Sequence, residues 1–128
     1  MPHILVIEDD AQLRPVLARM LRVSGYETTD AADGASGVAC WRDRGADLVI
    51  TDLHLGDMDG IQVVLQLRAE RPALPIIVMS GSAVAADTAR LREAHLLDGL
   101  IVLEKPFSLD TLTAVVRSAL ATPRQQQA

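Results

Sequence analysis

Residues 47–53 read Asp-Leu-Val-Ile-Thr-Asp-Leu, a short apolar run that ends in an aspartate at position 52. The run Leu48–Thr51 is rich in β-branched side chains and too short for a typical helix, which indicates a strand. Apolar residues fill both alternating sets of positions, as in a parallel sheet that helices cover on both faces. The stretch therefore predicts a buried strand that carries Asp52 at its carboxyl end.

Four further segments share this pattern, and one of them is weak. The stronger ones are Ile4–Ile7, Ile76–Met79 and Leu100–Leu103, and the weak one is Tyr26–Thr29. Each segment is flanked by turn-forming or charged residues. We therefore expect five short strands along the chain.

Longer segments with helical spacing lie between the strands. The first has apolar residues at i, i+3, i+4, i+7 and i+8 from Leu13. Pro15 is tolerated only in an opening turn, so we expect this helix to begin near Ala11 or Gln12 and to end before Gly25. The other predicted helices are Gly34–Arg44, Ile61–Arg71, Ala85–Leu96 and Leu109–Leu120, the last with Ser108 as its N-cap.

The strand-helix order repeats five times, which predicts an α/β sandwich with right-handed crossovers. A chain of 128 residues, 49% of them hydrophobic, has the size of one domain with one buried core. We expect that domain to span residues 1–121. Residues 122–128 are polar, and we expect them to form a frayed tail.

Composition disfavours several function classes. The net charge is −5 without a long basic run, and aromatic residues make up only 2%, so neither a basic nucleic-acid footprint nor a base-stacking platform is indicated. Apolar runs are too short to insert into a membrane, and the first residues do not resemble a signal peptide. A single cysteine, Cys40, gives no disulfide framework. These features predict a cytoplasmic domain.

Polar residues collect where the predicted strands end. The strand ends carry Glu8-Asp9-Asp10, Asp52, Ser80-Gly81 and Glu104-Lys105-Pro106. In open parallel sheets ligands bind beyond these ends. Clustered carboxylates favour an oxygen-liganded cation such as Mg²⁺. An aspartate can attack phosphorus to form an aspartyl phosphate, and a lysine with a metal ion can neutralise the phosphoryl oxygens.

The chain resembles the response-regulator receiver domains of two-component systems over residues 3–120. The matching motifs are Ile4–Asp10, Asp47–Leu53, Met58-Asp59-Gly60, Pro75–Gly81 and Lys105-Pro106-Phe107. The resemblance implies a flavodoxin-like (βα)5 doubly wound sandwich with strand order 2-1-3-4-5. It also implies a phosphoprotein that takes a phosphoryl group from a histidine kinase or a histidine phosphotransfer domain, and then changes its contacts with a downstream protein target.

The resemblance also implies a role for each matching residue. Asp52 would be phosphorylated, and Ser80 and Lys105 would contact the phosphoryl group. Mg²⁺, with Mn²⁺ as a substitute, would bind Glu8, Asp9, Asp52 and the backbone carbonyl of His54. The peptide bond before Pro106 would be cis.

The sequence departs from the family at three positions. Glu8 stands where Asp is commoner, and Gly56 stands where many members have Pro. Val102 occupies the switch position, three residues before Lys105, where many members have Tyr or Phe. A two-residue shift of the alignment would place Leu100 there, which is not aromatic either. We therefore expect switching without an aromatic flip.

Two alternative functions differ from the leading one. An Mg²⁺-dependent phosphatase with an aspartate nucleophile would need a second Asp two residues after it, where this chain has His54. A phosphate-independent pseudo-receiver would be expected to lose Asp52, Lys105 or the acidic pair, all of which are present. We expect no output domain after residue 121, and we therefore expect the chain to act through protein contacts, as a relay, or as a fragment of a longer protein.

Other polar residues are assigned simpler roles. Asp10 either caps the following helix or lies at the edge of the metal site. Asp57 and Asp59 are interpreted as parts of a solvated loop. The histidines, His3, His54 and His95, lack metal-ligand spacing, so we assign their side chains to the surface or to packing.

Overall fold

The protein, described here over residues 1–121 by a computed structural model, is built on one parallel sheet. The strands run in the order β2-β1-β3-β4-β5, and each pair is parallel. Their bounds are β1 His3–Ile7, β2 Glu27–Ala31, β3 Leu48–Asp52, β4 Ile76–Ser80 and β5 Leu100–Glu104. The α/β sandwich and the strand order expected from the sequence are confirmed.

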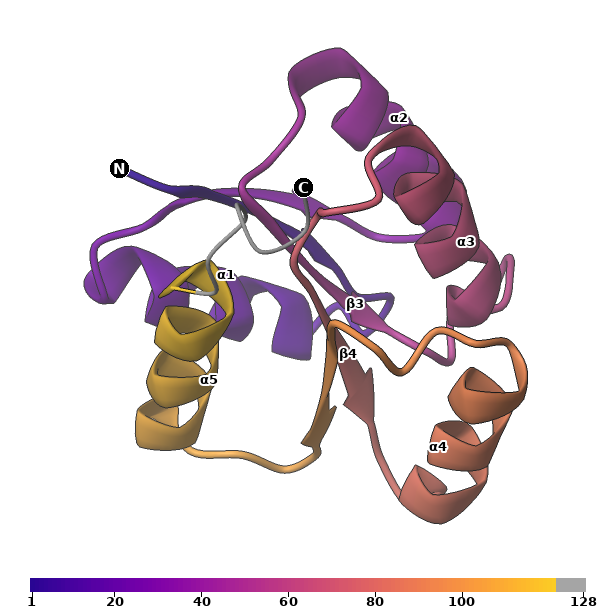
Figure 1. Ribbon diagram of the computed structural model, residues 1–128. Helices are drawn as coiled ribbons and strands as arrows, with labels where there is room; N and C mark the ends of the chain where they lie inside the picture. The colour runs from indigo at the N-terminus through magenta and orange to yellow at the C-terminus, as the bar shows by residue number, and fades with distance from the viewer. Residues whose placement is uncertain (122–128) are drawn as a thin grey trace.

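Five helices cover the two faces of the sheet (Figure 1). Their bounds are α1 Leu13–Val23, α2 Gly34–Arg44, α3 Gly60–Glu70, α4 Val84–Glu93 and α5 Leu109–Ala121. Helices α1 and α5 lie on one face, and α2, α3 and α4 lie on the other. Consecutive strands alternate with helices throughout, as the sequence predicted.

The core consists of two apolar clusters separated by the sheet. Leu5 and Ile7 of β1 pack toward α2, α3 and α4, whereas Ile4 and Val6 of the same strand pack toward α1 and α5. All residues of β3 and β4 are buried. This two-sided burial explains why these strands lack polar alternation in the sequence.

Strand β2 lies at an edge of the sheet and differs most from its prediction. It begins at Glu27 and ends at Ala31, two residues beyond the predicted Thr29. Its burial pattern is mixed, because an edge strand keeps part of its surface in water. Polar residues such as Glu27 and Asp30 are compatible with that position, and they weaken the hydrophobic signal.

Most helix ends lie within one residue of the expected bounds, and the start of α1 and the end of α4 depart most. Helix α1 begins at Leu13, one or two residues later than expected, and Pro15 falls in its first turn. Helix α4 ends at Glu93 rather than Leu96. There His95 adopts a left-handed conformation (φ 59°), and the amides of His95 and Leu96 donate to carbonyls of the last turn. A Schellman motif usually has glycine at this position, so no residue type signalled this end.

Other expected ends are confirmed. Gly25 follows α1 with φ 98°, and the Ser108 hydroxyl accepts a hydrogen bond from the Thr111 amide at the start of α5. No helix within residues 1–121 is long and apolar enough to cross a membrane. The expected polar tail, residues 122–128, lies outside the described residues.

Candidate functional site

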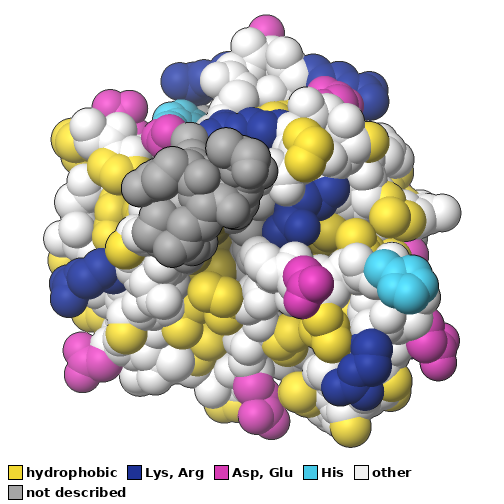
Figure 2. All heavy atoms as spheres, viewed as in Figure 1, with side chains coloured by type: hydrophobic (Ala, Val, Ile, Leu, Met, Phe, Trp, Pro, Cys, Tyr) yellow, Lys and Arg dark blue, Asp and Glu magenta, His cyan; other side chains and the backbone are white. Residues whose placement is uncertain are grey.

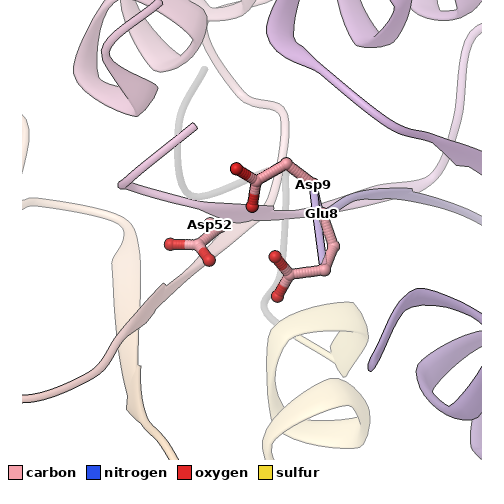
Figure 3. A group of neighbouring side chains, drawn as sticks. All are labelled: Glu8, Asp9 and Asp52. Atoms are coloured by element: carbon pink, nitrogen blue, oxygen red, sulfur yellow. The ribbon is translucent and has the colours of Figure 1, made fainter. Parts of the chain in front are cut away.

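Three acidic side chains converge at the carboxyl ends of β1 and β3. Glu8 and Asp9 follow β1, and Asp52 is the last residue of β3 (Figure 3). One carboxylate oxygen from each lies within 4.8 Å of the others. Glu8 and Asp52 are buried and Asp9 is exposed, so the cluster opens to solvent on one side.

Lys105 connects two of these carboxylates. Lys105 directly follows β5, and its Nζ lies 2.7 Å from Glu8 Oε1 and 2.7 Å from Asp52 Oδ2. Burial lowers the pKa of Lys105, but the hydrogen bonds with Asp52 and Glu8, together with the negative charge of these two groups, raise it by more, so the pKa lies above its usual value. Lys105 therefore stays protonated over the whole physiological range.

Glu8 has the most perturbed environment of the cluster. Burial raises its pKa, and the nearby Asp52 charge acts in the same direction, while the hydrogen bond from Lys105 lowers it in part. Three carboxyl groups that lie close together around one lysine offer the oxygen donors that a hard divalent cation such as Mg²⁺ prefers.

The backbone after Asp52 fixes the orientation of its carboxylate. The His54 amide donates to Asp52 Oδ1 at 2.9 Å, so one oxygen is held by the loop and the other by Lys105. Gly60, at the start of α3, lies directly against this backbone. A Cβ at Gly60 would approach the Asp52 carbonyl oxygen and Leu53 Cα to 2.5 Å, which only glycine avoids.

Ser80 ends β4, beside the acidic cluster, and its hydroxyl is engaged by a residue that sequence reasoning missed. Ser80 Oγ donates to Asp87 Oδ2 of α4 at 2.5 Å, and both side chains are buried. His54 Nε2 lies 3.0 Å from the same carboxylate oxygen. Asp87 precedes the buried Leu91 by one helical turn, and that spacing is the signal that could have placed it on the inner face of α4.

The structure separates the remaining acidic residues from the cluster. Asp10 caps α1, since its Oδ1 accepts hydrogen bonds from the Gln12 and Leu13 amides, which resolves the alternative left open by the sequence. Asp57 and Asp59 lie in the loop before α3 and outside the acidic cluster, as expected, and both also accept hydrogen bonds at helix starts. Asp57 bonds the amides of Gly34 and Ala35, and Asp59 caps α3 and pairs with Arg90.

The other predicted site positions lie within β5 and directly after it. The Lys105–Pro106 peptide bond is cis, the form that the resemblance implies. Val102 is partly buried in β5, packed against the cluster that includes Leu91. Metal binding by the His54 carbonyl and a switching role for Val102 stay predictions.

Comparison with known proteins decides the family. A family model described as the response regulator receiver domain matches residues 4–117. The chain belongs to this family. The receiver domains of this family act in signalling, and they are not classed as enzymes.

Relatives and solved structures agree with this assignment. The chain is 34% identical to the transcriptional regulatory protein ZraR of Salmonella typhimurium over 95% of its own length and 27% of that protein. It is 34% identical to PrrA of Mycobacterium tuberculosis over 93% of its length and 50% of that protein. The receiver domain of NtrX from Brucella abortus superposes with a TM-score of 0.83 at 31% identity, covering 94% of this chain and 99% of that one. This receiver domain thus spans a quarter to a half of these curated relatives.

Proposed function

We propose that this receiver domain accepts a phosphoryl group on Asp52 from a phosphohistidine donor. A carboxylate oxygen of Asp52 attacks phosphorus, the phosphorus–nitrogen bond to the imidazole breaks, and the released imidazole takes up a proton. The product is an aspartyl phosphate. The donor is a histidine kinase or a histidine phosphotransfer domain, the partners expected for this family.

One observation carries the proposal: Asp52 lies in a cluster with two further carboxylates and a bridging lysine. Lys105 is positioned to neutralise a phosphoryl oxygen once Asp52 carries the phosphoryl group, because it already contacts Asp52 Oδ2. The chain itself thereby assists phosphorylation and later hydrolysis. Ser80, at the end of the neighbouring strand, supplies a hydroxyl for another phosphoryl oxygen.

The three carboxylates fit Mg²⁺, with Mn²⁺ as a substitute. Glu8, Asp9 and Asp52 offer oxygen donors that lie close together, and the His54 carbonyl is a further candidate ligand. The ion, when bound, neutralises charge on the phosphoryl oxygens. Glu8 is fully buried and Asp9 exposed, so Asp9 is the better candidate for direct ligation from the solvent side.

The output of this domain is proposed to be a changed contact with a downstream protein in the cytoplasm. The relatives ZraR and PrrA are transcriptional regulatory proteins, but the matched regions cover only part of each. On the face of the molecule drawn in Figure 2, basic side chains are dispersed among acidic ones. That dispersal supports an output through protein contacts rather than direct nucleic-acid binding.

Transfer from phosphorylated donors tests the proposal. A panel of phosphorylated histidine kinases should label the wild-type chain in the presence of Mg²⁺ and should leave Asp52→Asn unlabelled. The substitution keeps the shape of the side chain and removes the nucleophilic carboxylate. Equal labelling of both proteins would refute the assignment, and a wild-type chain that none of the donors labels would favour a phosphate-independent adapter.

A further inference from the structure

We propose that Asp87 acts as a latch, holding the Ser80 hydroxyl away from the phosphoryl site until Asp52 is phosphorylated. The inference rests on the proposed function, since it concerns how that same site responds to phosphate. Asp87 is a positioning residue of α4 that acts through Ser80. Nothing in its sequence context, a helix start among alanines, suggested this role.

The argument begins with the serine proton. A serine hydroxyl has one proton and donates one strong hydrogen bond at a time. Here Ser80 Oγ donates to Asp87 Oδ2 at 2.5 Å, and Ser80 has no accessible surface. Ser80 must therefore release Asp87 before it can donate to a phosphoryl oxygen on Asp52.

Asp87 can release Ser80 without being left as an unpaired buried charge. Its side chain is 1% exposed, but His54 Nε2 lies 3.0–3.1 Å from its two oxygens and the Arg90 guanidinium lies 3.7 Å from Oδ1. The ring nitrogen is the donor, because a carboxylate has no proton to give. These partners remain after Ser80 leaves, so the exchange avoids the full penalty of an unsatisfied carboxylate.

The same contacts join the latch to two parts of the molecule. His54 follows Asp52 by two residues and its amide bonds the Asp52 carboxylate, while its ring reaches Asp87. Arg90, one turn after Asp87, pairs with Asp59 at the start of α3. Release of Ser80 thus removes a contact between α4 and the end of β4. The contacts of α4 with the β3–α3 loop, through His54 and Asp59, remain.

A double-mutant comparison tests the latch through binding of a phosphate mimic, beryllium trifluoride with Mg²⁺, measured by calorimetry. In Asp87→Ala the Ser80 hydroxyl no longer has a competing acceptor, so the mimic should bind about tenfold more tightly than to wild type. Asp87→Asn keeps the shape and one weaker acceptor, so its affinity should fall between those two. In a Ser80→Ala background, the change at position 87 should leave the affinity unaltered.

The outcomes separate this inference from the proposed function. One contrary result is that Asp87→Ala changes the affinity for the mimic equally in the wild-type chain and in the Ser80→Ala chain. Another is that it weakens binding in the chain that keeps Ser80. Either result would show that Asp87 has only a structural role. If Asp87→Ala does not fold, the same comparison with Asp87→Asn decides the matter. Failure of the wild-type chain to bind the mimic, or equal binding by Asp52→Asn, would instead refute the phosphoacceptor assignment.

Discussion

At the scale of single residues, each carboxylate at the rim has a distinct task set by its neighbours. Asp52 is held by an amide and an ammonium, Glu8 is buried behind it, and Asp9 faces solvent. Asp10, one position further, is used by the backbone of α1 instead. Adjacent acidic residues that look equivalent in the sequence are thereby separated into a candidate metal ligand and a helix cap.

This separation gives a prediction for metal binding. Asp9→Ala should lower Mg²⁺ affinity by at least about tenfold, because removing a direct ligand costs no less than removing a residue that supports one. It should also abolish metal-dependent phosphorylation while the chain stays folded. Asp10→Ala is the matched control, and it should bind Mg²⁺ close to the wild-type level although α1 loses its cap. Unchanged calorimetric binding in Asp9→Ala would place the metal elsewhere.

Gly60 gives a second prediction. Gly60→Ala should lower the free energy of unfolding by about 1–3 kcal/mol, because its Cβ would clash with backbone atoms that cannot move aside easily. The higher helix propensity of alanine offsets this only in part. Gly81→Ala, where nothing lies within 4 Å, is the control and should leave stability unchanged or raise it by up to about 1 kcal/mol in urea unfolding. Equal stability of the two variants would contradict the packing argument.

At the scale of elements, the sequence predicted helices and strands well where the local signal was complete. Gly25 and Ser108 marked their helix ends because each supplies a backbone or side-chain property that the end requires. The end of α4 escaped prediction because His95 adopts a glycine-like conformation. The positions of the strand ends predicted which residues of the site lie close together. The contact between Ser80 and Asp87 was not predicted, because it depends on which face of α4 is buried.

Asp57 supports a pH-dependent prediction for α2. Hydrogen bonds from the Gly34 and Ala35 amides lower the pKa of Asp57 below its usual value of 3.8. Its stabilising contribution is thus present above that value and is lost as the pH falls through the lower pKa of the folded state. Asp57→Ala should be less stable than wild type at neutral pH, and the difference should shrink in acid.

Urea unfolding at a series of pH values measures this difference. Asp43→Ala is the control, because Asp43 is an exposed aspartate of the same helix with no side-chain hydrogen bond among the described contacts. Its effect on stability should change little across the acid range. A destabilisation by Asp57→Ala that stays constant into strong acid would show that charge at Asp57 does not hold the start of α2.

At the scale of the whole molecule, we expect phosphorylation to change some segments of the backbone more than others. Val102 is a β-branched residue with restricted rotamers and offers no ring to reorient. Amide exchange with and without beryllium trifluoride should therefore change most in Gly81–Val84 and the start of α4, and little in Leu100–Leu103. Large changes over Leu100–Leu103, with Gly81–Val84 unaffected, would show that β5 carries the signal instead.

Chemical mapping of the modified residue shows whether Asp52 carries the phosphoryl group. Borohydride reduces an aspartyl phosphate to homoserine, so the phosphorylated residue becomes permanently lighter and can be located by peptide mass spectrometry. After phosphorylation in the presence of Mg²⁺, we expect homoserine at position 52 and unreduced aspartate at positions 9, 10 and 57. Homoserine at another aspartate, with position 52 unchanged, would contradict the assignment of Asp52.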